Sequence, residues 1–260
     1  MSGHAREHGR SVTSRVLSIL GAFDAEHSRL TLTELSRRSG MPLSTVHRLV
    51  GELVQWRALE PDEAGGYRVG LRLWELGQLA PGPLREVAHP WLQDLLDTTR
   101  ENVHMGIRED MEVLYIDKIC GRKAVPIVSR VGGRLPMHPT GVGKVLLANQ
   151  PRSFLQAYLA RPLARPTGYT IAEPGRLVGE LVEVRRRGWA VTYEEMTLGS
   201  CSLAAPVRGR DGHVTAAVGI VLSSRRAREL TNLVRPLQTT VTRIEQELWG
   251  DTGSAPQPAR

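Results

Sequence analysis

TLTELSRRSGMPLSTVHRLVGELVQW, residues 31–56, decides the fold of the first part of the chain. Thr31 can cap the exposed amides of a helix while Glu34, three residues later, reaches back toward the amide of Thr31, a pattern known as a capping box. Gly40 is suited to end that helix, because glycine readily takes the left-handed conformation that commonly follows one. Pro42 then holds the preceding residue out of helical geometry. The stretch therefore predicts two helices separated by a tight turn.

The second helix of this pair is predicted over residues 43–56 and has two different faces. One face is apolar at helical spacing, with Val46, Leu49, Val50 and Leu53. The opposite face is polar, with Ser44, Thr45, His47, Arg48 and Glu52. Such a helix can lie in the major groove of DNA, where Arg48 can reach a guanine or a phosphate. The alternative is a packed helical hairpin whose polar face only meets solvent.

Flanking elements extend the pair to a winged helix-turn-helix. An amphipathic helix is expected over residues 11–23. Residues 59–60 and 67–69 flank a polar tip with Gly65 and Gly66, which predicts a β-hairpin whose two glycines take positive φ. The residues that we expect to face DNA are Arg15, Thr31, Pro42, Leu43, Ser44, Thr45, His47, Arg48, Tyr67 and Arg68.

Composition bounds the class of protein. With 41% hydrophobic and 23% charged residues, a chain of 260 residues has the content of folded domains. The net charge is +7, but residues 1–80 hold ten arginines and nine carboxylates, so DNA binding is predicted from local geometry and not from overall charge. Cys120 and Cys201 form neither a disulfide framework nor a zinc spacing, which favours a reducing cytoplasm. No apolar run approaches the ~20 residues of a membrane span, so no membrane partner is expected.

The remainder of the chain predicts a second, α+β domain. A short apolar helix over 71–79 ends at a Pro-Gly-Pro boundary at 81–83. Strands are expected near 103–108, 112–118, 125–130, 189–193, 202–207 and 214–222. Helices are expected over 84–96, 154–159, 177–187 and 230–248. A glycine-rich loop at 132–143 is expected to open a further helix that ends at 148. Runs of strands with helices at their ends indicate a largely antiparallel sheet. The apolar stripe of the last helix is interpreted as a core face, with an oligomer seam as the alternative.

Nine short motifs, in one order along residues 10–250, are similar to those of a known family. They are VTSRVL (12–17), LTEL (32–35), PLSTVHRL (42–49), YRVG (67–70), LPMH (135–138), GVGKVLLA (141–148), RGW (187–189), EE (194–195) and LAAPV (203–207). On these motifs the chain resembles the IclR-type transcription regulators. The resemblance implies a DNA-binding domain at 10–70, a linker helix at 71–83, a GAF-like effector-binding domain at 84–250 and a disordered tail at 251–260. It also implies a homodimer or dimer of dimers that binds double-stranded operator DNA and responds to a small-molecule effector, expected to be an organic acid.

The resemblance also implies an effector pocket, lined by the segment around LPMH and by three C-terminal strands. Carried over by position, its residues are Leu135, Met137, Thr140, Gly141, Val142, Thr192, Ser202, Gly219 and Val221. Family members that bind small carboxylates tend to have Asp in place of Thr192 and Ser in place of Gly219 and Val221. Because this chain departs at all three positions and Gly219 is expected to leave space, we expect an aromatic or branched acid, held at the amides of residues 140–142.

Other interpretations of the sequence lead to different functions. GVGK at 141–144 suggests a phosphate-binding loop, but Val145 stands where that motif needs Ser or Thr. Cys201 suggests a nucleophile, but no partner histidine is identifiable, and a small buried thiol is the simpler interpretation. The histidines show no metal-ligand spacing. We therefore expect no catalytic residue, cofactor or metal. A hydrolase-like enzyme built on the second domain is the alternative function, and a regulator whose sensor has lost its ligand is another.

Overall fold

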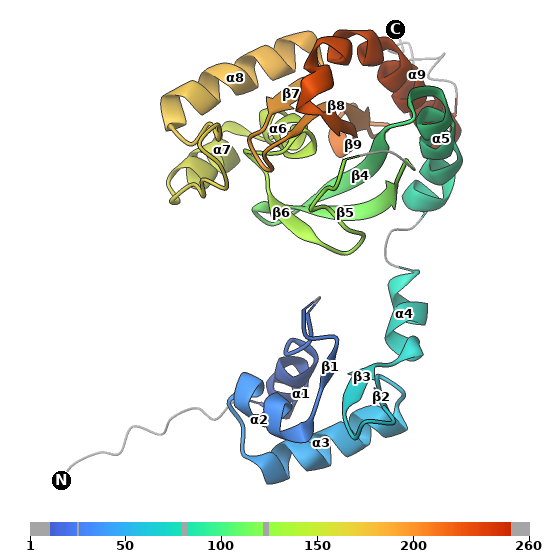
Figure 1. Ribbon diagram of the computed structural model, residues 1–260, viewed down its shortest axis with the longest axis vertical. Helices are drawn as coiled ribbons and strands as arrows, with labels where there is room; N and C mark the ends of the chain where they lie inside the picture. The colour runs from blue at the N-terminus through green and yellow to red at the C-terminus, as the bar shows by residue number, and fades with distance from the viewer. Residues whose placement is uncertain (1–10, 25, 80–82, 122–124, 251–260) are drawn as a thin grey trace, which may run out of the picture. The chain divides into compact units, whose positions relative to one another are not determined.

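The structure, a computed structural model, describes residues 11–24, 26–79, 83–121 and 125–250. The chain divides into two compact units, Met1–Gly82 and Pro83–Arg260, which are described separately (Figure 1). The predicted tail at 251–260 lies outside the described residues, as do residues 80–82 of the predicted linker.

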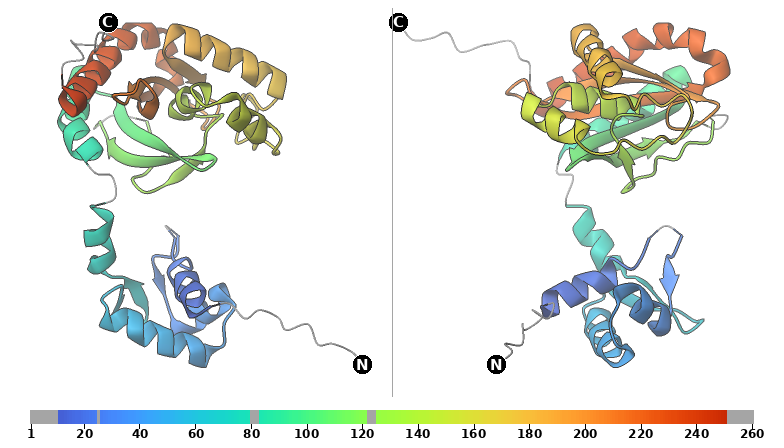
Figure 2. Two further views of the ribbon diagram at one scale, coloured as in Figure 1. Left: turned by 180° about the vertical axis from the view of Figure 1, so that it is seen from behind. Right: turned by 90° about the vertical axis from the view of Figure 1, so that its left-hand side faces the viewer.

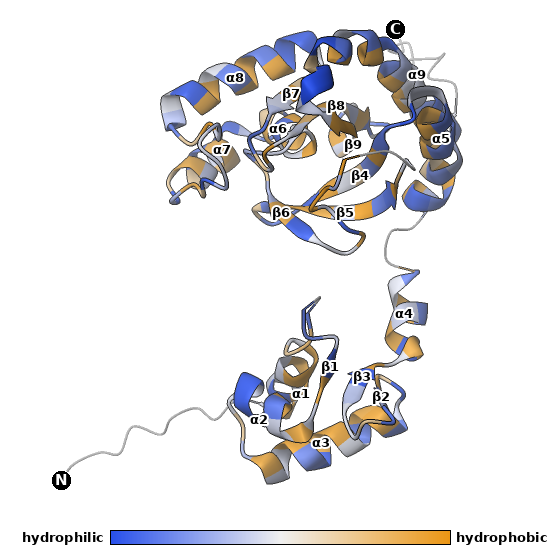
Figure 3. Cartoon of the chain, viewed as in Figure 1, coloured by the Kyte–Doolittle hydropathy of each residue, from blue (hydrophilic) through white to orange (hydrophobic). Residues whose placement is uncertain are grey.

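The first unit is a small helical domain with a three-stranded sheet. In chain order it contains α1 (Val12–Leu20), β1 (Arg29–Leu30), α2 (Leu32–Ser39), α3 (Leu43–Gln55), β2 (Leu59–Pro61), β3 (Tyr67–Val69) and α4 (Leu71–Gly77). The apolar faces of its helices meet in one core around Ile19, Leu35 and Leu49, all fully buried. Figure 3 shows hydrophobic and hydrophilic residues interleaved along α3, as expected of a helix with one buried face.

Local signals set the ends of α2 as the sequence predicts. The side chain of Thr31 accepts a hydrogen bond from the amide of Glu34 at 3.3 Å, and the amide of Thr31 donates to Glu34 Oε2 at 2.8 Å, so the capping box is confirmed. Gly40 ends α2 in the left-handed conformation, with φ of 68°. Helix α3 begins directly after Pro42, which leaves the tight turn of a helix-turn-helix between them.

The wing differs from the prediction in two details. β2 and β3 form the expected antiparallel hairpin, but β1 adds a third strand that pairs with β3, in the order β1-β3-β2. A strand of two residues has too few alternating positions to be visible in sequence. Of the two glycines at the tip, only Gly65 has a positive φ, of 80°; Gly66 is held by its amide, which donates to Asp62 Oδ1 at 3.1 Å.

The second unit is an α+β domain, as predicted. It comprises α5 (Pro83–Thr99), β4 (Asn102–Glu109), β5 (Glu112–Ile119), β6 (Arg134–Pro136), α6 (Gly141–Ala148), α7 (Arg152–Leu159), α8 (Pro174–Arg187), β7 (Ala190–Tyr193), β8 (Ser200–Arg208), β9 (Val214–Ser223), a 3-10 helix (Ser224–Glu229) and α9 (Leu230–Trp249). The six strands form one sheet in the order β6-β5-β4-β9-β8-β7, and every neighbouring pair is antiparallel.

Helices cover both faces of this sheet (Figure 2). α5 and α9 pack on one face, against alternate β9 residues such as Val218 and Ile220, and buried Leu237 and Ile244 confirm that the stripe of α9 is a core face. α6, α7 and α8 belong to a second core on the other face. The small residues Ala190, Ala204 and Gly219 are direct cross-strand neighbours there, and they let α6 approach the sheet closely.

The expected strand at 125–130 is absent, and β6 pairs with β5 in its place. Pro126 has no amide to donate to a neighbouring strand. Side chains hold this segment instead: Asn102 Nδ2 donates to the carbonyl of Val125 at 2.7 Å, and Lys118 Nζ donates to the carbonyl of Ser129 at 2.6 Å. The segment therefore runs beside the sheet without pairing with it, and side chains hold it at two points. We refer to residues 125–131 as the wall.

Candidate DNA interface and effector pocket

The exposed face of α3 carries most of the residues that the sequence assigns to DNA. Pro42, Leu43, Ser44, His47 and Arg48 are exposed, and Thr45 is half-buried. The opposite face is in the core, where Val46 and Leu49 are fully buried. The sequence therefore separates the two faces of α3 correctly, and four polar side chains, those of Ser44, Thr45, His47 and Arg48, remain available to a partner.

Within the described residues, the side chains of three expected DNA residues have partners. Arg48 Nη1 is 2.5 Å from Glu52 Oε1, one helical turn along α3. Arg68 Nη2 is 3.0 Å from Glu60 Oε2, its direct neighbour across β2 and β3. Thr31 uses its hydroxyl in the capping box. Surface ion pairs of this kind contribute little stability, so both arginines can exchange their partner for a phosphate or a base.

The start of α3 forms a hollow together with α1. Its lining includes Arg15, Gly40, Met41, Pro42 and Thr45. Pro42 is the N-cap and provides no side-chain hydrogen bond, and among the described residues no group accepts from the amides of Leu43 and Ser44. Free amides at the positive end of a helix, beside an arginine, are suited to an anion.

Two placements in the three-stranded sheet, on β3 and on β1, refine the sequence prediction. Tyr67 is half-buried and packs against the core of the first unit, so only part of its side chain can meet a partner. Arg29 on β1 lies directly across from Arg68 and is exposed, and sequence reasoning missed it because β1 itself was not predicted.

The second unit contains a cavity between the sheet, the start of α6 and two loops. Six of the nine carried-over residues line it: Leu135, Thr140, Gly141, Thr192, Ser202 and Val221. The other lining residues are His104, Tyr115, Ile127, Val128, Ser129, Pro139, Glu195, Met196, Thr197 and Ser200. The cavity has a volume of about 40 Å³.

The remaining three carried-over residues do not line the cavity. Met137 is fully buried in the core under α6 and α8. The Val142 side chain points at the sheet, 2.9 Å from where a Cβ of residue 219 would stand. The expectation that Gly219 leaves space is wrong, because His104 Nε2 lies 2.5 Å from that same position. The imidazole already fills the space above the glycine.

Neutral polar groups gather on the cavity floor. Thr192 Oγ1 and Ser202 Oγ are 2.6 Å apart on neighbouring strands. His104 Nδ1 is 3.1 Å from Ser129 Oγ. Burial, reinforced by the charge of Lys118, lowers the pKa of His104 from 6.5 to about 3, and burial raises the pKa of Tyr115 above its ordinary value. Both rings are therefore uncharged at neutral pH.

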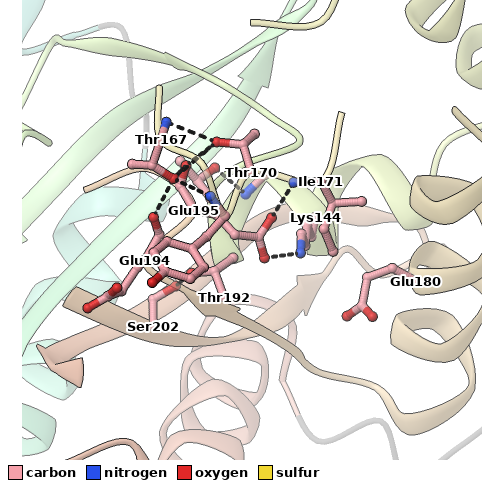
Figure 4. A network of polar contacts seen from close by, with 12 residues as sticks. Lys144, Thr167, Thr170, Ile171, Glu180, Thr192, Glu194, Glu195 and Ser202 are labelled. Atoms are coloured by element: carbon pink, nitrogen blue, oxygen red, sulfur yellow. Dashed lines mark hydrogen bonds and ion pairs between the residues drawn. The ribbon is translucent and has the colours of Figure 1, made fainter. Parts of the chain in front are cut away.

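A buried ion pair holds the loop that forms the other wall (Figure 4). Lys144 Nζ on α6 is 2.5 Å from Glu195 Oε1, and both side chains are almost fully buried. Thr170 Oγ1 donates to the carbonyl of Glu195 at 2.7 Å, and Thr167 Oγ1 donates to that of Glu194 at 2.7 Å. Burial raises the pKa of Glu195, while Lys144 opposes that shift. Because Lys144 already has this carboxylate, it does not present a free cation to the cavity.

The two cysteines lie in different surroundings. Burial raises the pKa of Cys201 to about 11, which keeps its thiol protonated, whereas Cys120 is exposed. Within the described ranges no group of three or more His, Cys, Asp or Glu side chains could hold a metal ion. No helix in the described part of the chain has the length and apolar character needed to cross a membrane.

Comparisons with known proteins agree over both units. Residues 12–63 match the family described as "IclR helix-turn-helix domain", and residues 78–246 match "Bacterial transcriptional regulator IclR C-terminal". The chain is 34% identical to the HTH-type transcriptional regulator XynR of Escherichia coli, over 86% of this chain and 91% of that protein. It is 30% identical to the transcriptional repressor IclR of Escherichia coli, over 80% and 78% respectively.

A solved structure has the same fold. It is an IclR homologue from Microbacterium hydrocarbonoxydans complexed with 4-hydroxybenzoate, 32% identical in sequence, with a TM-score of 0.87 over 92% of this chain and 99% of that one. The relatives named here are transcriptional regulators or homologues of one. The first unit has a helix-turn-helix with an exposed polar face, and the second is an α+β unit with a lined cavity. Together with the matches to both family descriptions, these features show that the chain belongs to the IclR family of DNA-binding, effector-responsive transcriptional regulators.

Proposed function

We propose that α3 is the recognition helix of this regulator and that its N-terminal half contacts operator DNA. Ser44, Thr45, His47 and Arg48 would face base edges, where an arginine can bind guanine through two hydrogen bonds. The free amides of Leu43 and Ser44, with Arg15 beside them, would bind a backbone phosphate and fix the register of the helix. Arg68 and Arg29 on the wing would add phosphate contacts. Because bacterial operator DNA lies in the cytoplasm, we also propose that the protein is cytoplasmic.

We further propose that the effector is an aromatic or branched carboxylic acid. The observation that carries this proposal is the start of α6, where Gly141 lines the cavity and no described group accepts from the amides of Gly141 and Val142. A carboxylate suits that positive helix end. Apolar side chains such as Leu135, Val221 and Val128 would surround the rest of the ligand, in keeping with cavities that are mainly apolar with a few placed polar groups.

The size of the cavity has a consequence for this proposal. A cavity of about 40 Å³ is much smaller than the roughly 300–1,000 Å³ of pockets that hold drug-sized ligands, so an aromatic acid would have to move the walls outward. The wall at 125–131 suits that movement, because side-chain contacts hold it and Val128 is 51% exposed. The ligand of the Microbacterium homologue, 4-hydroxybenzoate, supports an acid of this size.

Calorimetry on the full chain tests the ligand class. Benzoate and 4-hydroxybenzoate should bind at least tenfold more tightly than pyruvate or glyoxylate, because the small acids leave apolar surface unmatched. Val221→Phe should fill the cavity and abolish the response to the ligand while DNA binding persists. Val178→Phe, on the outer side of α8, is the matched control and should respond normally. Tight binding of pyruvate or glyoxylate with no binding of the aromatic acids would refute the proposal.

We also propose that two chains pair through α1 and α4, as a homodimer or a dimer of dimers. Leu17 is 61% exposed, Trp74 63% and Leu79 76%, a large apolar surface for so small a unit. Pairing also suits recognition, because one short helix contacts too few base pairs for genomic specificity. In this arrangement residues 10–70 bind DNA, 71–83 link the units and 84–250 bind the effector.

A further inference from the structure

We propose that His104 is a specificity-determining residue of the effector pocket, which selects aromatic acids that carry a hydroxyl group on the ring. The inference rests on the proposed function, which places an aromatic acid in this pocket. It adds that the imidazole of His104 forms a hydrogen bond with the hydroxyl group on the ring of that acid. None of the motifs in the sequence pointed to His104. It lines the cavity and contacts Gly219.

The imidazole is fixed in place and keeps one nitrogen unused. The His104 residue is only 5% exposed, and Ser129 Oγ lies 3.1 Å from its Nδ1. Nε2 has no hydrogen-bond partner among the described residues. The surrounding protein also does not enclose it fully, so the atom remains accessible. His104 lines the cavity, and because Nδ1 is engaged with Ser129, we assign Nε2 as the atom that would meet a ligand.

Gly219 makes this position of the ring possible. His104 and Gly219 are direct neighbours across β4 and β9. A Cβ at residue 219 would stand 2.5 Å from Nε2 and 2.7 Å from Cδ2, so any larger residue there would displace the imidazole. The lack of a side chain at residue 219 on β9 therefore leaves room for the imidazole of His104 on β4.

The chemistry of a neutral imidazole favours a hydroxyl over a second charge. Nε2 either donates or accepts one hydrogen bond, according to the tautomer, and a hydroxyl group can match both states. A methyl group of similar size would bury Nε2 without a partner, which weakens binding by about tenfold or more. The carboxylate of the ligand has a better place at the amides of α6. Together, one acid group and one ring hydroxyl satisfy both polar regions of the cavity.

The experiment compares ligands that differ only in this contact. Calorimetry on the wild-type full chain would use 3- and 4-hydroxybenzoate against 3- and 4-methylbenzoate, with benzoate as reference. We expect at least one hydroxybenzoate to bind about tenfold more tightly than its methyl analogue. In His104→Phe, which keeps a ring over Gly219 but has no nitrogen, that preference should shrink to about twofold or less. His213→Phe, at an exposed turn, is the matched control and should keep the full preference.

A second measurement needs no variant. In wild-type protein with ¹⁵N-labelled histidine, the Nε2 resonance of His104 should shift on addition of the preferred hydroxybenzoate and not with its methyl analogue. An unchanged preference in a folded His104→Phe, or an Nε2 resonance that does not respond to bound hydroxybenzoate, would overturn the role of His104 alone. Absence of binding by all five acids to the wild-type protein would overturn the proposed ligand class, and the inference with it.

Discussion

His104 should make the stability of the second unit depend on pH. Burial lowers its pKa from 6.5 to about 3, so between these values the unfolded chain binds a proton that the folded chain does not. The free energy of unfolding should therefore fall as the pH drops from about 6.5 toward 3, by at most about 1.4 kcal/mol per pH unit from this residue. Above pH 7 the imidazole is neutral in both states and contributes no pH dependence.

Urea unfolding of wild-type protein and His104→Phe at pH 7, 6, 5 and 4 isolates this contribution, because all other groups titrate in both proteins. The wild type should lose more stability than the variant over this range. Parallel pH profiles would show that His104 is protonated as easily in the folded protein as in the unfolded chain.

Arg48 should contribute to operator affinity, and Glu52 should oppose it. Arg48→Ala should weaken specific binding by roughly 1–3 kcal/mol if the guanidinium contacts a base. Glu52→Gln should strengthen binding by about twofold, because it releases Arg48 from a surface pair that itself contributes little. Gel shifts at one salt concentration, on operator and random duplexes, separate the two roles of the arginine.

An equal loss on both duplexes would make Arg48 a phosphate contact, and no loss would remove it from the interface. Arg186→Ala is the matched control, since Arg186 forms a similar exposed pair with Glu183 in the second unit. It should leave both affinities unchanged.

At the scale of elements, Thr31 should matter more for α2 than for DNA. Its hydroxyl is engaged in the capping box, so Thr31→Ala should cost about 1 kcal/mol of stability in the first unit, the usual effect of losing an N-cap side chain. Thr31→Ser should retain most of it. Urea unfolding gives the stability change, and operator titration under conditions where both variants are fully folded gives the affinity. A drop in affinity with no change in stability would reverse this assignment and make Thr31 a DNA contact.

Elements with strong local signals could be predicted from the sequence, and elements held by distant contacts could not. Thr31, Gly40 and Pro42 act within a few residues of their own position, which is why the ends of α2 and the start of α3 were found. The apolar run at 125–130 also looked like a strand, but its carbonyls accept from Asn102 and Lys118, whose positions only the folded sheet determines. β6 was hidden in a glycine-rich segment for the same reason.

The pocket shows the same limit. Residues near the α6 motif and on the last strands line the cavity where the lining depends on backbone position, as for Thr140 and Val221. His104 was missed and Gly219 misread, because the contact between them follows from the pairing of β4 with β9. Sequence spacing contains no information about which of two paired residues occupies the space between a sheet and a helix.

At the scale of the whole molecule, Trp74 should govern assembly. In the full chain, Trp74→Asp should weaken self-association and operator binding together, because it places a charge in the apolar surface of α1 and α4. Sedimentation equilibrium and gel shifts measure the two effects. Tyr169→Asp is the matched control, since Tyr169 is 64% exposed on the second unit and Trp74 is 63% exposed. Unchanged association of Trp74→Asp would place the interface elsewhere.

The contrast between the two cysteines makes the chain suited to selective labelling. A maleimide reacts with a thiolate, so exposed Cys120 should be modified while Cys201, buried and with a pKa of about 11, stays intact. Cys120 directly follows β5, on the chain segment that leads to the wall at 125–131. A fluorophore on that thiol would report movement of the wall in the wild-type protein. Metabolites could then be screened by fluorescence in a plate without mutating a residue.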